Sequence, residues 1–356
     1  FYYEICCSSP KLGPVEYLSI DFIGESGTLS CFGTSTVDNG IGNGMDGVAR
    51  DLSSRHSLPK AIEAIWVSYT DRKVYKISSL LPYDTILSLF KYGGEPCLPA
   101  DKGINFEEVH KFIQCLDICF LPSGKVVLFL KAGVKTILLD WSAYGSIVTD
   151  DEILSQIYTK WGLEDMDQYY DVYYSKEESP EYEYWHNYMD KYGSVGPLME
   201  RYLQRFNYEL KFEFEDKKSN IYSVESQFTN GEQHWETSKF NEAFKMPSRL
   251  KESCMVWNTK DFHYTCFMYF NEEEVLRVFD EAYGEDRMQK GELRVKVCKY
   301  NNLFDISLNV GEKSIKLEKT EIRVFQDPID DPDGDGTLIY KNYEGNHRNL
   351  FIDDEG

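Results

Sequence analysis

The side chains that could do chemistry are scattered along this sequence and form no recognisable catalytic motif. A nucleophile elbow needs Gly-x-Ser-x-Gly and a zinc-protease helix needs His-Glu-x-x-His, and neither pattern occurs. The Gly-rich stretch 38–47 lacks the Gly-Lys-Ser/Thr of a phosphate loop and is predicted to be a surface loop. The six histidines are far apart: His56, His110, His186, His234, His263 and His347. The sequence therefore predicts no catalytic residue, no cofactor and no enzyme, with an enzyme of unrecognised type as an alternative.

Three aspartates near the C-terminus have the opening spacing of a calcium loop. Asp331, Asp333 and Asp335 alternate and are followed by Gly336, so their carboxylates could converge on one hard cation. The full loop also needs a bidentate Glu at its twelfth position, where this chain has Asn342. A solvated acidic turn is therefore favoured, and these aspartates are the candidate ligands if a metal is bound.

The nine cysteines do not form a metal-binding pattern. Cys115 and Cys119 are four residues apart, but no second pair completes a zinc site. Cys254 and Cys266 flank a predicted turn, and two buried thiols are favoured over a disulfide between them. This usage favours a reducing compartment.

The charge is strongly negative and unevenly distributed. The net charge is −22, of which residues 1–150 contribute −4 and the remaining chain −18. Nucleic acid is an unfavourable partner because phosphates are bound by basic patches. A basic protein is favoured because opposite charges accelerate association. No run of 18 apolar residues exists that could span a membrane.

An acidic stretch rich in tyrosine, 164–192, combines aromatic area with charge. Tyrosine is a favoured anchor at protein interfaces, so we predict that this stretch binds the partner. The predicted contact residues are Tyr169, Tyr170, Tyr173, Tyr174, Glu177, Glu178, Glu181, Tyr182, Glu183 and Tyr184. The alternative is that these tyrosines are buried between the two halves of the chain.

The secondary structure around these residues is organised by an internal repeat. Residues 61–92 align without a gap on 250–281, with six identities in 32 pairs. Each segment predicts two alternating strands and a short helix, with strands at 61–69 and 73–80 and a helix at 83–92 in the first. Further alternating stretches flank both segments. The prediction is a mainly β (α+β) chain of two similar antiparallel-sheet domains, each with one helix packed on its sheet.

The repeat sets the predicted domain boundaries. These are a lead-in at 1–13, a first β repeat at 14–149, a helical, acidic, tyrosine-rich insert at 150–203, a second β repeat at 204–326 and an acidic tail at 327–356.

Two segments of the first repeat resemble the bacterial domain of unknown function numbered 2931. The first segment runs from Leu58-Pro59 through Trp66-Val67-Ser68-Tyr69 and Lys73-Val74-Tyr75 to Leu81-Pro82. The second is ICFLPSGKVVLFL, residues 118–130, where Ser123 stands in place of the first Gly and Phe129 in place of a Trp. The resemblance covers roughly 14–149, and the internal repeat extends it to an apparent second tandem copy.

The resemblance implies a role outside catalysis. Members of that family are mostly described as lipoproteins of Gram-negative bacteria, and some lie beside secreted antibacterial toxins. We therefore expect an immunity protein that caps a basic toxin, with an envelope structural or ligand-binding lipoprotein as the alternative. Cys7-Ser8-Ser9-Pro10 resembles a mature lipoprotein start, but Glu4-Ile5-Cys6 is a poor lipobox. A cytoplasmic location is predicted, with a lipid-anchored periplasmic one as the alternative.

Overall fold

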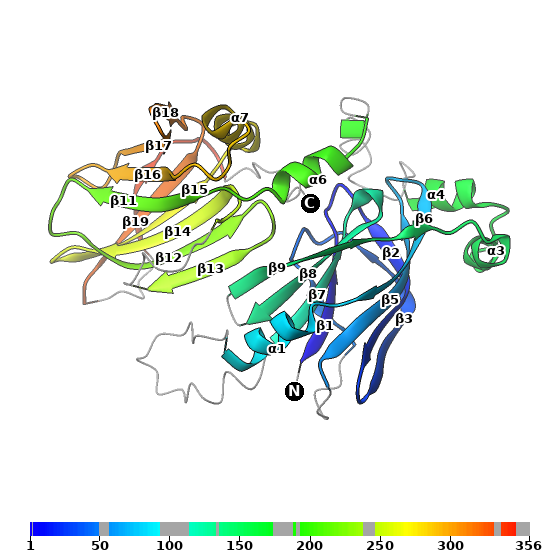
Figure 1. The fold of residues 1–356 in the computed structure, drawn as a ribbon. Coiled ribbons are helices and arrows are strands. Elements are labelled where there is room, and N and C mark those ends of the chain that lie inside the picture. The colour runs from blue at the N-terminus through cyan, green and yellow to red at the C-terminus, as the bar shows by residue number, and fades with distance from the viewer. Residues whose placement is uncertain are drawn as a thin grey trace. The chain divides into compact units, whose positions relative to one another are not determined.

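The computed structural model describes residues 1, 3–49, 57–92, 114–132, 135–173, 188–189, 193–237, 246–330 and 336–346. The chain divides into two compact units, unit 1 from Phe1 to Glu200 and unit 2 from Arg201 to Asp354. Both units are mainly β, as predicted (Figure 1). The described part of the predicted insert up to Glu200, including its helices α3 (Asp151–Thr159) and α4 (Met166–Tyr173), groups with unit 1, and residues 201–203 group with unit 2.

Unit 1 contains two sets of paired strands. The first set is antiparallel throughout, in the order β10 (Ser146–Ile147), β6 (Lys73–Leu80), β5 (Pro59–Ser68), β2 (Val15–Gly24) and β3 (Gly27–Val37). The second set has the order β9 (Lys135–Tyr144), β8 (Lys125–Ala132), β7 (Gln114–Phe120), β1 (Glu4–Ser8) and β4 (Met45–Ala49). Here β1 and β7 are parallel, which the prediction of purely antiparallel sheets did not include.

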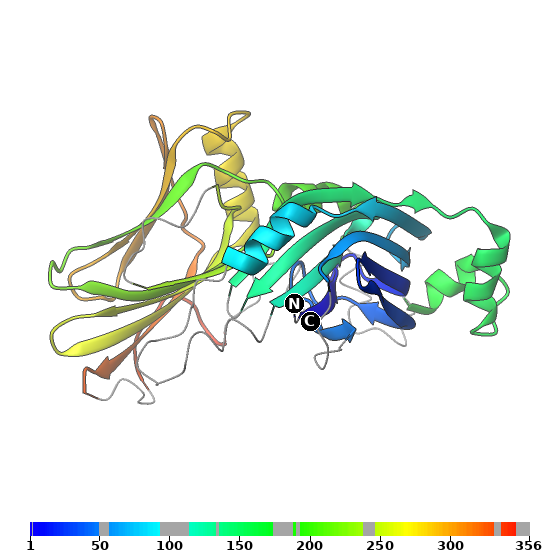
Figure 2. The ribbon, with the colours of Figure 1, turned by 60° about the horizontal axis from the view of Figure 1, so that its bottom comes forward.

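The core of unit 1 lies between these two sets of strands. Trp66 of β5 is fully buried, stacks on Tyr75 of β6 with ring centroids 5.5 Å apart, and meets Phe120 of β7 at 4.8 Å. Helix α1 (Tyr83–Tyr92) adds the fully buried Ile86 to the same core, and Figure 2 shows α1 lying against the strands of unit 1. One continuous apolar core therefore joins both sets of strands and α1.

A short 3-10 turn, η2 (Pro122–Gly124), connects β7 to β8 and depends on two left-handed residues. Ser123 has φ +67°, and Gly124 has φ +73° with its Cα facing the Tyr75 ring, where a Cβ would lie 2.6 Å from a ring carbon. The Ser123 amide donates to the Asp71 carboxylate at 2.7 Å, which also accepts from the Tyr75 hydroxyl at 3.2 Å. The left-handed backbone at Ser123 explains why the resembling pattern has Gly there.

Unit 2 also contains two sets of paired strands. The larger has the order β20 (Thr337–Lys341), β19 (Glu321–Pro328), β15 (Phe262–Tyr269), β14 (Leu250–Asn258), β12 (Asn220–Phe228) and β13 (Gln233–Thr237). The smaller has the order β11 (Tyr208–Phe214), β16 (Gly291–Val297), β17 (Phe304–Val310) and β18 (Lys313–Lys316), with β11 and β16 parallel. Helix α7 (Glu272–Tyr283) packs on the smaller set, and helix α6 (Gly196–Tyr202) precedes β11.

A hairpin followed by a helix occurs at both predicted places. The elements are β5, β6 and α1 in unit 1 and β14, β15 and α7 in unit 2. Each hairpin has a buried tryptophan stacked on a tyrosine of the next strand, Trp66 on Tyr75 and Trp257 on Tyr264. In the ungapped alignment, however, Trp66 falls on Met255 rather than on Trp257. The similarity of the two units as whole domains is not established by these elements.

The two helices bury their equivalent phenylalanines to different extents. Phe279 of α7 is 1% exposed and packs edge-on against Phe206 and Tyr208 at 5.0 and 5.2 Å. Phe90 of α1 is only partly buried and contacts the rings of Phe1 and Tyr3 near the N-terminus. Replacement of Phe279 therefore removes contacts on all sides, whereas replacement of Phe90 does not.

We expect Phe279→Ala to lower the free energy of unfolding by about 3–5 kcal/mol, the usual cost of truncating an enclosed phenylalanine. Phe90→Ala should cost clearly less because that ring is already partly hydrated. Urea denaturation of the two variants and the parent, followed by tryptophan fluorescence and circular dichroism, measures the difference. Equal losses for both variants would contradict this account of α1 and α7.

Candidate functional site

Helix α4 of the tyrosine-rich insert is held on unit 1 by Arg72, in the turn between β5 and β6. The guanidinium donates to Asp171 at 2.6 Å and to Asp167 at 2.9 Å, and it lies 5.2 Å from the centroid of the Tyr170 ring. Both carboxylates are largely exposed, so each ion pair contributes little alone. Together with the ring contact they fix α4 in one orientation.

A buried carboxylate provides the second attachment of α4. Glu16 of β2 is 4% exposed and accepts hydrogen bonds from the hydroxyls of Tyr69, at 2.6 Å, and Tyr169. The Tyr69 and Tyr169 rings stack at 6.3 Å with an angle of 7° between their planes. The pKa of both tyrosines is raised, mainly by burial and to a smaller extent by the nearby Glu16 carboxylate. Their hydroxyls therefore remain hydrogen-bond donors at neutral pH.

These contacts correct the predicted partner surface at two of its residues. Tyr169 and Tyr170 are each 5% exposed and belong to an apolar cluster with Val67, Val74 and Ile157 of unit 1. They are therefore core residues of unit 1 and are not available as exposed anchors while α4 is docked. The side chain of Tyr173, at the end of α4, and all predicted contacts from Tyr174 to Tyr184 lie outside the described residues. The prediction for them stays a prediction.

The candidate metal ligands Asp331, Asp333 and Asp335 also lie outside the described residues. In the part of the chain that the structure describes, no three His, Cys, Asp or Glu side chains converge as metal ligands. None of the helices described is long and apolar enough to cross a bilayer.

The cysteines are arranged differently from the sequence expectation in one respect. Cys254 and Cys266 are free thiols, as favoured, on neighbouring strands. Cys6 of β1 and Cys115 of β7 form a disulfide, although the cysteine usage favours a reducing compartment. Cys7, in the same strand, is a buried free thiol.

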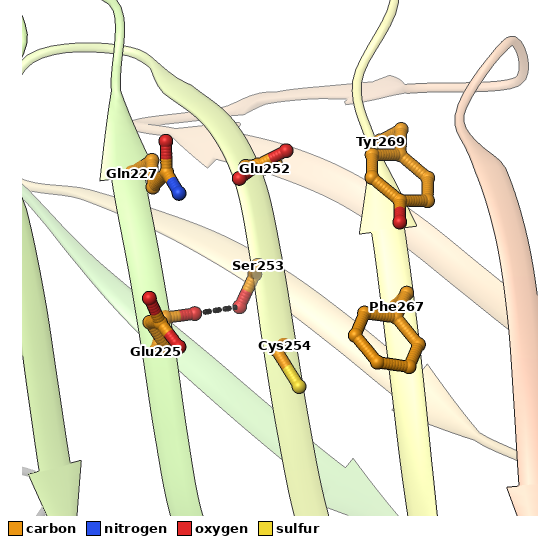
Figure 3. Close-up of a pocket in the computed structure, with 7 residues that line it drawn as sticks. All are labelled: Glu225, Gln227, Glu252, Ser253, Cys254, Phe267 and Tyr269. Atoms are coloured by element: carbon orange, nitrogen blue, oxygen red, sulfur yellow. Dashed lines mark hydrogen bonds between the residues drawn. The ribbon is translucent and has the colours of Figure 1, made fainter. Parts of the chain in front are cut away.

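A small pocket opens on the larger set of strands in unit 2 (Figure 3). Its volume is about 170 Å³, below the usual size of a site for a drug-like ligand. The lining residues come from three adjacent strands: Glu225 and Gln227 of β12, Glu252, Ser253 and Cys254 of β14, and Phe267 and Tyr269 of β15. A pocket of this size accommodates a single side chain.

The strand register places the lining residues in two rows across the pocket. Glu225, Cys254 and Phe267 are paired in one row, and Gln227, Glu252 and Tyr269 in the other. The Ser253 hydroxyl donates to the main-chain oxygen of Glu225 at 2.9 Å and ties β12 to β14 beneath the rows (Figure 3). The pocket therefore has rigid walls and presents two carboxylates beside two aromatic rings.

Arg323 of β19 shows how a cation is accommodated on these rings. Its guanidinium carbon lies 4.6 Å from the Phe267 centroid and 5.7 Å from that of Tyr269, and it donates to the Tyr269 hydroxyl at 3.0 Å. Cations bind to aromatic faces through the ring quadrupole. The site thus places the carboxylates of Glu225 and Glu252 beside two rings that already hold the chain's own cation, Arg323.

The Cys254 thiol is not a nucleophile at neutral pH. Burial first, and then the negative charges of Glu225 and Glu252, raise the pKa of Cys254 to about 12. The thiol is the form that persists, whereas the thiolate is the reactive form. The pocket is therefore suited to binding rather than to covalent chemistry.

No sequence pattern indicated this pocket directly. Alternation predicted strands at 250–258 and 262–269, but alternation alone does not say which face is solvated or which strands are neighbours. Glu225, Gln227 and Arg323 were not singled out. Only the pairing of β12 with β14, and of β15 with β19, brings them together.

We expect the double variant Glu225→Gln/Glu252→Gln to react faster with iodoacetamide at Cys254. Removing two negative charges lowers the pKa of the thiol, and each pKa unit corresponds to roughly tenfold more thiolate. Burial still holds the pKa above its usual value. Mass spectrometry of the Cys254 peptide over a pH series measures the rate, with Glu285→Gln/Glu312→Gln, at two exposed glutamates outside the pocket, as the matched control. Equal rates in the parent and the double variant would rule out an effect of these two carboxylates on the pKa of Cys254.

Comparison with known proteins gives a match for the first half of the chain. A family model described as "Protein of unknown function (DUF2931)" matches residues 1–193, which includes α3 and α4 but no part of the unit 2 strands. No curated protein and no solved structure matches the chain.

Proposed function

The chain belongs to the DUF2931 family of proteins of unknown function, and on that premise we propose that it is a non-enzymatic protein that binds a basic protein partner. The observation that carries the proposal is the pocket on unit 2, with Glu225 and Glu252 beside Phe267 and Tyr269. It has the size of one side chain and the chemistry to hold a lysine or arginine. The net charge of −22 would draw such a partner in from solution.

The role we propose is immunity, in which the chain caps a cognate antibacterial toxin. Capping requires a rigid complementary surface and no catalytic group, and the protonated Cys254 fits that requirement. The predicted acidic contacts Glu177, Glu178, Glu181 and Glu183 belong to unit 1 and remain a second proposed contact region for the same partner. Because Tyr169 and Tyr170 are buried, we now assign the central anchor to the unit 2 pocket.

An envelope protein is the second candidate, and the Cys6–Cys115 disulfide favours it. Disulfides persist in oxidising compartments such as the periplasm and are rare in the cytosol. We therefore propose a periplasmic location ahead of the cytoplasmic one. A lipid on Cys7 is disfavoured because β1 buries that residue.

We also propose that unit 2 derives from a second copy of the unit 1 fold. The supports are the two hairpin-plus-helix segments and the stacked Trp–Tyr pair in each. A crystal structure of the chain should then superpose β5 on β14 with Trp66 on Trp257, and β6 on β15 with Tyr75 on Tyr264, the connection between the paired rings being two residues shorter in unit 2. A poor superposition, with the tryptophans on different faces of their hairpins, would refute the duplication.

The immunity proposal is tested by growth protection against the product of the gene adjacent to the one for this chain. Cells producing that product should grow when the chain is present, and better when the chain carries a cleavable export signal than when it lacks one. The charge-reversed variant Glu225→Lys/Glu252→Lys should abolish protection and weaken binding of the purified product at least roughly tenfold, or about 1.4 kcal/mol.

The matched control is Glu285→Lys/Glu312→Lys, which makes the same charge change at two exposed positions of unit 2 outside the pocket. It should protect like the parent. If the neighbouring product is harmless and forms no complex with the chain, immunity is excluded. If it binds the pocket variant and the parent equally, the pocket assignment is wrong.

A further inference from the structure

Arg323 of β19 is a cation without a carboxylate partner among the described residues. Its guanidinium has several N–H donors, and the one hydrogen bond that it makes among these residues goes to the Tyr269 hydroxyl. Its Nε atom is buried with no hydrogen-bond partner in the same part of the chain. Guanidinium groups bind carboxylates through paired N–H bonds, and Arg323 keeps donors for such a contact.

A second cation lies directly opposite Arg323. Lys341 of β20 is its cross-strand partner, so both side chains point to the same face of the strands. The Lys341 ammonium lies 4.5 Å from the centroid of the Tyr343 ring and donates to the main-chain oxygen of Gly345, and it forms no ion pair with a described residue. Like charges directly opposite each other destabilise a sheet, and an anion bound between them offsets that cost.

The two cations belong to the same row of side chains as the acidic pocket. Across the strands this row consists of Glu225, Cys254, Phe267, Arg323 and Lys341. Figure 3 shows the acidic part of the row, with the Phe267 ring at its border. Neighbouring strands lie about 4.8 Å apart, so the midpoint of the two cations is on the order of 10 Å from the pocket.

The carboxylates closest to the two cations along the chain do not pair with them. Glu321 is the cross-strand partner of Tyr269, is 8% exposed and forms no ion pair with Arg323. Glu344 is exposed and forms none with Lys341. The three aspartates of 331–335, outside the described residues, belong to the connection between the opposite ends of β19 and β20.

A basic side chain in the pocket would share the rings of Phe267 and Tyr269 with Arg323. Two cations at one pair of rings repel each other, and an anion held at Arg323 and Lys341 offsets that repulsion. We propose that the partner presents two opposite charges to this face: a lysine or arginine for the pocket and, on the order of 10 Å away, an aspartate or glutamate for the two cations. This inference rests on the proposed function and adds an acidic group to the partner's contact surface.

The inference reverses the expected effect of one substitution. Lys341→Glu makes the chain more negative, so net charge alone predicts tighter binding of a basic partner. A partner carboxylate beside Lys341 predicts weaker binding, because the substitution places two anions together. The sign of the change in Kd therefore distinguishes a purely basic contact surface from one that carries both charges.

The experiment is calorimetric titration of the full chain with the purified product of the adjacent gene. Lys341→Glu should raise Kd at least roughly tenfold with an unchanged melting temperature, because this side chain is half-buried and at the end of its strand. Arg323→Gln should also raise Kd, and its melting temperature shows whether the ring contacts tolerate the change. The matched control is Lys218→Glu, the same charge change at an exposed lysine ahead of β12, which should bind at least as tightly as the parent.

Carbodiimide cross-linking of the complex identifies the partner carboxylate directly. The reagent activates a carboxylate, and a contacting amine displaces the resulting urea to form an amide. Mass spectrometry should find such an amide between Lys341 and an aspartate or glutamate of the product. Lys341→Arg keeps the positive charge and should bind like the parent, but it should lose this cross-link.

The outcomes separate this inference from the proposed function. A product that does not bind the parent excludes both. A product that binds the parent, loses affinity for Glu225→Lys/Glu252→Lys and binds Lys341→Glu as tightly as the parent overturns this inference alone. A complex that forms without a cross-link at Lys341 also overturns it and leaves the basic contact in place.

Discussion

Unit 1 depends on the enclosure of a single indole ring. Trp66 fills the space between the two sets of strands, and its contacts with Tyr75 and Phe120 come from different sets. The backbone adapts to it: Gly145 lies where a Cβ would come within 2.5 Å of the Trp66 ring. The indole N–H is buried without a hydrogen-bond partner among the described residues, a cost that the apolar contacts must offset. The same core receives Ile86 of α1, so the hairpin and the helix pack on one continuous apolar core.

Local patterns identified elements well because they reflect local physics. Alternation located the strands of the first hairpin to within two residues, and a proline followed by a 3.6-residue apolar period located α1. The pairing of β1 with β7 and of β11 with β16 could not be read in this way. Period-2 alternation says which side chains share a face of one strand, but it carries no information about which distant strand lies alongside.

The functional residues, like the strand pairings, could be predicted from local patterns only in part. Tyrosines in an acidic stretch indicated a binding surface, yet the partner that buries Tyr169 is Glu16, a residue 153 positions earlier in the chain. An aromatic residue looks the same in sequence whether it contacts a partner or its own core. The pocket residues had no signal of their own because each row takes one residue from each of three strands. Such a site exists only once the register is fixed.

The parallel pairing of β1 with β7 has a consequence for the order of events during folding. The disulfide in this pair links residues 109 positions apart, so the N-terminal strand cannot find its place until more than a hundred further residues are available. Non-local contacts of this kind slow folding, because the entropy of closing the loop is lost before the contact stabilises the chain. Within unit 1, β1 can therefore be placed only after β7 is available, and until then an edge of β7 stays open. An open strand edge is a template for pairing with another chain, so the interval before β1 docks is the one in which unit 1 is most exposed to aggregation.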